Sequence, residues 1–190
     1  MRAFIAIELP VEIKNSLSRI QEKLKIEPLK INWVKPQNLH LTLKFLGDIP
    51  PKQLNEIKQI ISGITRITSG FEIKLNTPGV FPDMAAARII WIGTDQLPLE
   101  LKQLAEQLEI KLAVSGIPRQ EKTFSAHITI GRIKSLLLLS DLEKVIDKIK
   151  TAAAGLNWGF DCKKVTLFES TLGPGGPAYT VLDQFNLKIA

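Results

Sequence analysis

The chain has 190 residues, with 25 Lys and Arg against 19 Asp and Glu, which gives a formal net charge of +6 at pH 7. Hydrophobic residues make up 45% and charged residues 23% of the chain. This ordinary globular mix excludes a disordered, collagen-like or coiled-coil chain and predicts one folded unit over residues 1–190. The excess of positive charge favours an anionic partner such as RNA.

Hydrophobic periodicity and turn residues predict alternating strands and helices along the first half of the chain. The predicted elements are a strand at 2–8, a helix at 11–25, a short extended segment at 31–34, a strand at 39–46, a helix at 52–65 and strands at 70–76 and 88–93. The last two strands flank a predicted turn at Thr77-Pro78-Gly79 and a loop through Pro82-Asp83.

The second half repeats this order. It is predicted to contain a helix at 97–114, a strand at 124–132, a helix at 140–152, a strand region across 158–169, a loop at 173–177 and a final strand at 179–188. Because helix, strand, turn and strand follow both of the strands with polar faces, we expect an α+β fold. It should be bilobed, with two pseudo-symmetric lobes, each an antiparallel sheet with helices, and an active-site cleft between them.

Cys162 is the only cysteine, so an intrachain disulfide and a thiolate zinc site are both excluded, and we read it as a buried structural thiol. This usage fits a reducing compartment, and we expect a cytoplasmic protein. The longest apolar run is Leu136 to Leu139, far short of the roughly 20 residues that span a bilayer. We therefore expect no membrane association.

Both histidines of the chain occur in the same pattern, His-x-Thr-x, at His40 to Leu43 and at His127 to Ile130. Side chains alternate along a strand, so His40 and Thr42 share one face while the intervening leucines face an apolar layer. His127 and Thr129 repeat this arrangement. Each lobe thus offers one imidazole and one hydroxyl.

Two facing imidazoles suit paired general acid and base catalysis, because histidine titrates near neutral pH. In phosphate ester cleavage one imidazole would accept a proton from the attacking oxygen and the other would protonate the leaving oxygen. Thr42 and Thr129 would donate hydrogen bonds to the non-bridging oxygens. With two histidines and scattered carboxylates, we expect no metal site and no other cofactor.

The whole chain resembles the two-histidine phosphoesterase superfamily, and within it the RNA 2′,3′-cyclic phosphodiesterases, also called 2′-5′ RNA ligases. The resemblance rests on four segments: the opening residues 1–7, Asn38 to Gly47, Ala126 to Arg132, and Glu169 to Leu172. It implies a bilobed fold and metal-independent opening of 2′,3′-cyclic phosphate ends of RNA to 2′-phosphates.

The resemblance also implies that His40 protonates the departing 3′ oxygen and that His127 activates water, although near-symmetric histidines exchange roles when a reaction runs in reverse. Two basic residues are further candidates for substrate binding. Lys44 shares strand parity with His40, so it can face the same cleft. Arg132 has the opposite parity to His127 and reaches the cleft only if a bulge or the end of the strand intervenes.

Three functions stay open on the sequence. The leading one is hydrolysis of RNA 2′,3′-cyclic phosphate ends by a monomer. The second is ligation or cleavage of 2′-5′ linkages, for example on tRNA halves, by the same two histidines. The third is a non-catalytic module that binds such RNA ends without turning them over.

Overall fold

The computed structural model describes residues 1–25, 30–134, 139–154, 158–174 and 176–189. Its elements confirm the α+β class. The strands are β1 (Arg2–Glu8), β2 (Ile31–Trp33), β3 (His40–Asp48), β4 (Phe71–Lys74), β5 (Thr77–Phe81), β6 (Ile89–Gly93), β7 (His127–Ile133), β8 (Gly159–Cys162), β9 (Lys164–Gly173) and β10 (Gly176–Asn186). The α-helices are α1 (Val11–Leu24), α2 (Leu54–Thr65), α3 (Leu99–Val114) and α4 (Leu139–Ala154), with short 3-10 helices η1 (Pro36–Asn38) and η2 (Pro51–Gln53).

The strand order shows an internal twofold pseudo-symmetry. The main sheet runs β10-β9-β1-β3-β7-β6-β5, with β2 on β7, and β4 pairs separately with β8. About an axis between β3 and β7, the order β9-β1-β3 mirrors β5-β6-β7, since each set joins its strands in antiparallel pairs. The prediction of two pseudo-symmetric lobes is therefore confirmed, and β10 and β2 are the strands without a counterpart.

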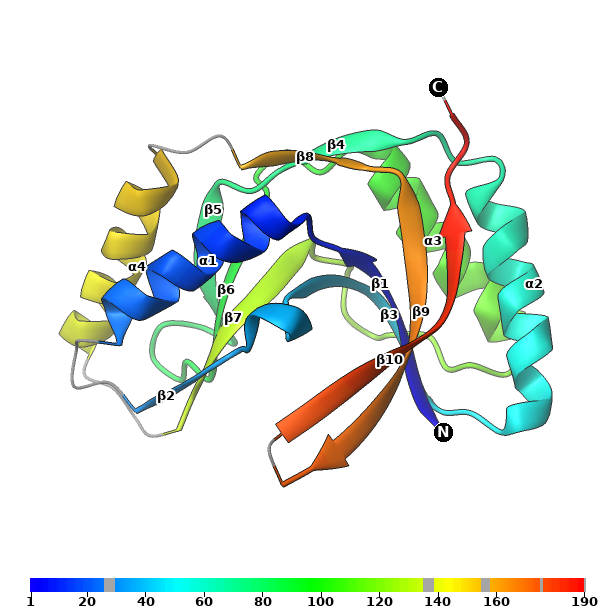
Figure 1. Ribbon diagram of the computed structural model, residues 1–190, viewed down its shortest axis with the longest axis horizontal. Coiled ribbons are helices and arrows are strands. Elements are labelled where there is room, and N and C mark those ends of the chain that lie inside the picture. Colours follow the sequence, from blue (N-terminus) through cyan, green and yellow to red (C-terminus); the bar gives the residue numbers. More distant parts are fainter. Residues whose placement is uncertain (26–29, 135–138, 155–157, 175, 190) are drawn as a thin grey trace.

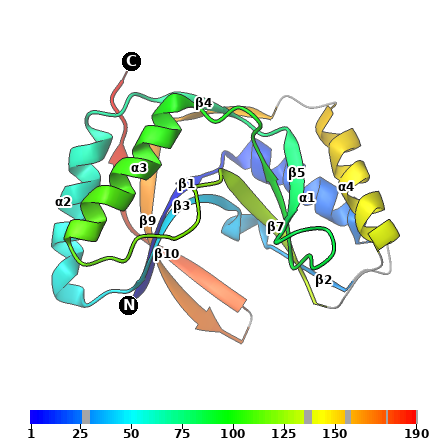
Figure 2. The ribbon, with the colours of Figure 1, turned by 180° about the vertical axis from the view of Figure 1, so that it is seen from behind.

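Each lobe contains elements from both halves of the chain. Helices α2 and α3 pack together on the side of β3 and β10, whereas α1 packs against α4 on the side of β5, as both ribbon views show (Figure 1, Figure 2). Thus α1 from the first half joins α4 from the second, and α2 joins α3 in the same way. The two sequence repeats exchange helices, so neither repeat corresponds to one lobe.

The two faces of the main sheet differ in what covers them. One face packs on the helices in the large core, to which the strands contribute Ile5, Leu41 and Ile128 and the helices Leu17 and Leu104. The other face carries His40, Thr42, His127 and Thr129 and is called the histidine face below. A separate small cluster of Phe4, Ala6 and Phe168 with Tyr179 lies on it.

One predicted turn proved wrong. The segment Thr77-Pro78-Gly79 opens strand β5 instead of forming a turn. Proline and glycine are turn residues in most contexts, but β5 is the outermost strand of its side of the sheet. Pro78 lacks a backbone N–H, and an edge strand tolerates this because one side of its backbone needs no ladder partner. The predicted strand region at 158–169 is two strands, β8 and β9.

Candidate active site

Strands β3 and β7 bring the two histidine motifs together at the pseudo-twofold axis. The strands meet in antiparallel orientation at the pair Leu41 and Ile128, both fully buried on the core side. Because neighbouring side chains on a strand point to opposite faces, His40 and Thr42 flank Leu41 on the histidine face, and His127 and Thr129 flank Ile128 there. The sequence prediction that each motif presents an imidazole and a hydroxyl on one face is confirmed in its geometry.

Both imidazole rings are held by the backbone in the same way. Nδ1 of His40 lies 2.7 Å from the carbonyl oxygen of Asn38, and Nδ1 of His127 lies 2.7 Å from that of Ser125. A carbonyl oxygen only accepts, so in each ring Nδ1 carries the hydrogen and donates it. The Nε2 atom of the neutral ring is then left with its lone pair, which is the form that a general base needs.

The segment before His40 is fixed by a contact with the far end of the chain. Asn38 ends η1, and its side-chain Nδ2 donates to the carbonyl oxygen of Pro177 in β10 at 2.8 Å. The same residue supplies the carbonyl that anchors the His40 ring. Asn38 therefore ties the orientation of His40 to the β9–β10 hairpin.

A bulge follows each motif at the same position. The β1–β3 pairing skips Leu43, and the β6–β7 pairing skips Ile130, each the third residue after its histidine. A bulge adds one residue to one strand, so every later side chain changes face. The residues at the next position, Lys44 and Gly131, are therefore buried on the core side, and those after them, Phe45 and Arg132, are exposed.

The expectation that Lys44 faces the histidines is wrong for this reason. Its side chain is fully buried, and Nζ donates to Oε2 of Glu109 at 2.7 Å and to the carbonyl oxygen of Pro118 at 2.9 Å. Glu109 Oε2 also accepts the backbone N–H of Gln120. Lys44 is thus a buried cation that links β3 to α3 and to the loop after α3. It lies on the opposite side of the sheet from His40 and Thr42.

Arg132 reaches the histidine face through the bulge that the parity argument required. Its charge is one of those that lower the pKa of His40, and it also acts on the hydroxyl of Tyr179. Gly131, the residue before Arg132, is on the core side of the strand, and a Cβ atom there would come within 2.8 Å of Cγ2 of Ile31. The positive charge of Arg132, which follows the second motif in sequence, therefore acts on the imidazole of the first motif.

His40 lies in an apolar enclosure that controls its ionisation. Its ring centroid is 4.9 Å from that of Phe4 and 5.2 Å from that of Tyr179, which meets it edge-on. Burial is the main cause that lowers the pKa of His40 to about 4; the hydrogen bond to Asn38 opposes it, and the charges of Lys14, His127 and Arg132 add to it. In the free protein His40 is neutral at pH 7.

His127 lies in a related but more open setting. Its ring meets Phe81 edge-on with centroids 5.0 Å apart and Trp91 at 6.1 Å. Burial lowers the pKa of His127 as well, while the hydrogen bond to Ser125 opposes this. The two imidazoles therefore differ in surroundings although their backbone anchors are equivalent.

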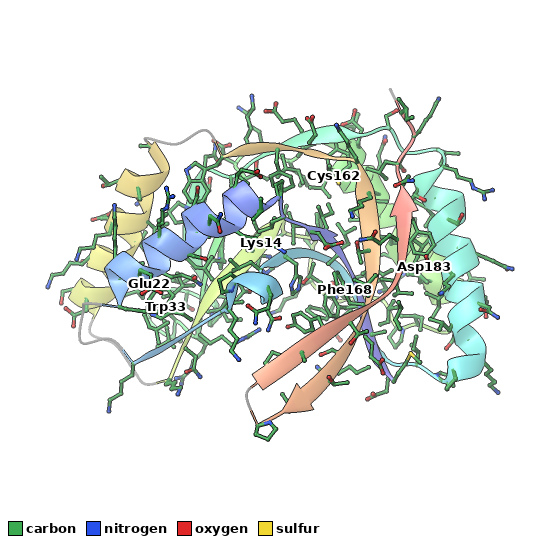
Figure 3. All side chains as sticks on the ribbon, in the orientation of Figure 1. Lys14, Glu22, Trp33, Cys162, Phe168 and Asp183 are labelled. Carbon is green, nitrogen blue, oxygen red and sulfur yellow. The ribbon has the colours of Figure 1, made fainter. Side chains whose placement is uncertain are left out.

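Sequence reasoning missed several residues around the histidines. Lys14 of α1 is one of them, since its charge acts on His40. Tyr179 closes the His40 side from β10, next to Phe168, which Figure 3 shows beside β9 and β10. Only one of the missed groups had a sequence signal: Phe81 and Phe168 are spaced by 87 positions, as the two histidines are.

Cys162 is confirmed as a buried thiol. It ends β8 on the core side (Figure 3), and burial raises its pKa to about 12. A neutral thiol is a poor nucleophile and metal ligand, so Cys162 has no part in the site. Among the residues that the structure describes, no three His, Cys, Asp or Glu side chains gather as a metal site would require.

A fold with two equivalent halves and one His-x-Thr-x strand from each defines a two-histidine phosphoesterase. The family described as LigT like Phosphoesterase matches the chain twice, over residues 7–91 and 92–179, in agreement with the pseudo-symmetry of the sheet. The chain belongs to this family, within the group whose curated members are named RNA 2′,3′-cyclic phosphodiesterase.

Relatives of that name match over their full length. The protein from Methanocaldococcus jannaschii is 35% identical over 97% of this chain and 100% of its own, and that from Methanothermobacter thermautotrophicus is 32% identical over 98% and 99%. Among solved structures, a Thermus thermophilus protein has a TM-score of 0.81 at 28% identity, covering 99% of this chain and 98% of its own. Escherichia coli LigT complexed with 3′-AMP has a TM-score of 0.79 at 28% identity, covering 98% and 97%.

No helix among the described residues is long and apolar enough to cross a membrane.

Proposed function

We propose that this protein hydrolyses RNA 2′,3′-cyclic phosphate ends to 2′-phosphates without a metal, and that His40 and His127 together form the general acid–base pair. The observation that carries the proposal is the pair of backbone-anchored imidazoles on strands β3 and β7, which meet at the pseudo-twofold axis. Full-length relatives named for this activity support it, and a relative solved with 3′-AMP supports the binding of a ribonucleotide at such a fold.

The proposed reaction is an in-line displacement at phosphorus. One neutral imidazole accepts the proton of the attacking water, the new P–O bond forms, and the bond to the 3′ oxygen breaks. The second imidazole, protonated beforehand, gives its proton to that oxygen. The product is a 2′-phosphate, and the two imidazoles have exchanged protonation states, so a proton must pass through solvent before the next turnover.

Thr42, Thr129 and Arg132 are proposed to bind the phosphate oxygens. The threonines lie on the histidine face, each two residues beyond its histidine, and no hydrogen bond within the described part of the chain engages either hydroxyl. Arg132 supplies a permanent positive charge near His40. Donors and cations that are already in place stabilise the charge that develops on non-bridging oxygens without any reorganisation.

The direct test uses an oligoribonucleotide with a 2′,3′-cyclic phosphate end, incubated with the purified protein in the presence of EDTA. The expected product carries a 2′-phosphate, identified by its resistance to 3′-specific phosphatases and by mass. An unchanged cyclic end would refute the proposal. A product joined to an added 5′-hydroxyl strand would show the 2′-5′ ligase reaction, and retention without turnover would show a binding module.

The pH dependence of kcat/KM should be bell-shaped with its maximum below neutral pH. The active form of the free enzyme has one neutral and one charged imidazole, and it is most populated between the two pKa values. Burial lowers the pKa of His40 to about 4 and lowers that of His127 from 6.5, so both lie on the acidic side. A kcat/KM profile that is flat from pH 4 to 9, or that peaks above pH 7, would contradict this.

The kcat profile should be displaced toward higher pH than that of kcat/KM. The bound phosphodiester is an anion, which favours the imidazolium form of both rings and raises both pKa values in the complex. Measuring both parameters at constant ionic strength on the cyclic substrate separates the two effects. Superimposable profiles would mean that the bound phosphate does not act on the imidazoles.

Replacing Arg132 with alanine should lower kcat/KM about tenfold to a hundredfold, since one charge-assisted hydrogen bond to the phosphate is lost. Lysine at this position should restore part of the loss, because the charge remains but the planar fork does not. The matched control is Arg66→Ala, an exposed arginine at the end of α2. Equal kinetics for the Arg132→Ala and Arg66→Ala variants would remove Arg132 from the site.

The cytoplasmic location and the monomeric state belong to this proposal as well. The single, buried cysteine is consistent with a reducing compartment. Sedimentation of the purified protein tests the monomer.

A further inference from the structure

The pseudo-symmetry places two phenylalanines in equivalent positions, one beside each histidine. In one lobe, Phe168 of β9 pairs with Phe4 of β1. In the other, Phe81 of β5 pairs with Ile89 of β6. Phe4 and Ile89 are themselves equivalent, since they pair with Phe45 and Arg132, which follow the two bulges. Phe81 and Phe168 therefore occupy the same site in the two lobes.

The two phenylalanines differ in how far they are covered. Phe168 is 8% exposed, stacked on Phe4 with centroids 5.2 Å apart, and Tyr179 packs edge-on against Phe4. Tyr179 comes from β10, the additional strand outside β9. No described strand lies outside β5, so Phe81 has no such cover and stays partly exposed. The protein closes the His40 side with its own aromatic ring and leaves the His127 side open.

Phe81 is held as part of a rigid aromatic platform, formed by Phe81 and Trp91. The two rings are stacked with centroids 5.1 Å apart and an interplanar angle of 28°. Trp91 in turn lies against the backbone of Gly79, where a Cβ atom would come within 2.3 Å of Cζ2 of the indole. Glycine at this position allows the indole to lie flat on the sheet, so the platform is positioned before any ligand arrives.

We propose that this aromatic platform stacks the base of the nucleotide that carries the reacting phosphate, so that the nucleoside and its departing 3′ oxygen lie on the His127 side. His127 then protonates the 3′ oxygen and His40 activates the water, the reverse of the assignment that the resemblance implies. The inference rests on the proposed function. A nucleoside places its base one ribose away from the phosphate, and the ring of Phe81 is the immediate neighbour of the His127 imidazole at 5.0 Å. Stacking on an aromatic face is favourable for every base. The subsite therefore binds purines and pyrimidines with little preference.

The test compares two substrates that differ only in the base. One is adenosine 2′,3′-cyclic phosphate, and the other is 1-O-methylribose 2′,3′-cyclic phosphate, which has the reacting group but no base. The Phe81→Leu variant should lose about tenfold to a hundredfold in kcat/KM on the nucleotide, from the loss of one stacked base. It should keep the wild-type value on the base-free substrate, and Phe81→Trp should restore turnover of the nucleotide.

The matched control is Phe45→Leu, a phenylalanine that is 56% exposed and belongs to the His40 lobe, where its ring centroid lies 6.2 Å from that of Phe4. It should leave both substrates unaffected. If Phe81→Leu loses the same factor in kcat/KM on both substrates, Phe81 only supports His127. If Phe45→Leu loses as much kcat/KM on the nucleotide as Phe81→Leu does, the loss of any exposed phenylalanine has this effect. Either result overturns the platform. A wild-type protein that cleaves neither substrate would refute the proposed hydrolysis itself.

Discussion

Replacing either His40 or His127 with alanine should lower kcat on a 2′,3′-cyclic RNA end by about a hundredfold to ten-thousandfold. Each variant loses one of the two proton transfers, and neither has a substitute, since the chain has no third histidine. The double variant should be only slightly slower than the slower single variant, because groups that act as a unit are not additive. Single-turnover rates measured with excess enzyme test this without interference from product release.

The fold of these variants needs its own control, because the ring of His40 packs on Phe4 and Tyr179. Glutamine at position 40 keeps much of the side-chain volume but transfers no proton at neutral pH. Thermal unfolding of His40→Gln should match that of the wild type while its activity is lost. If both alanine variants turn over at nearly the wild-type rate, the two-histidine mechanism is wrong.

A substrate with a better leaving group then distinguishes the acid from the base. A p-nitrophenyl phosphodiester releases an anion that needs no proton, so loss of the general acid costs little on it, whereas loss of the base costs as much as before. One of the two alanine variants should therefore recover most of its activity on this ester. That variant identifies the histidine that faces the leaving oxygen.

The Lys44→Ala variant should have the largest effect on stability, lowering the free energy of unfolding by about 3 kcal/mol. Lys44 is fully buried and Glu109 is 22% exposed, so the substitution removes the cation and leaves a largely covered carboxylate without its partner. The deleted stem also leaves a cavity beneath β3. Urea denaturation at 25 °C measures the change.

Two further variants separate the causes of this effect. Lys52→Ala removes an exposed lysine from η2 and should change the stability by less than about 0.5 kcal/mol. The double variant Lys44→Met with Glu109→Leu replaces the ion pair by apolar groups of similar size and should recover most of the loss. If Lys44→Ala is no less stable than Lys52→Ala, the buried pair does not stabilise the fold.

The same pair links stability to the site. Glu109 also binds the backbone of Gln120, in the loop that leads to Ser125 and His127. Loss of Lys44 should therefore loosen the segment that anchors the His127 ring, although Lys44 itself lies on the core side of the sheet. Its role is one of positioning, in contrast to the phosphate contact that strand parity had suggested.

Local patterns in the sequence were sufficient for most elements and for the two motifs. Helices α1 and α2 follow from apolar residues at helical spacing, and side chains at this spacing, such as Leu17 and Ile57, are buried. The alternation of His40, Leu41 and Thr42 fixed which side chains share a face. These properties depend on residues that are close together in the chain, so they can be predicted from a single sequence.

The tertiary structure decided what depends on partner strands. The bulges at Leu43 and Ile130 arise in pairing with β1 and β6, and they send Lys44 inward and Arg132 outward, which parity along one strand does not show. The enclosure that lowers the pKa of His40 is made by Phe4 and Tyr179, from opposite ends of the chain. Periodicity in the sequence indicates which face a residue takes in a regular strand. Contacts between distant segments decide where a strand bulges, which helices share a lobe, and that Tyr179 covers the side of Phe168 while Phe81 stays partly exposed.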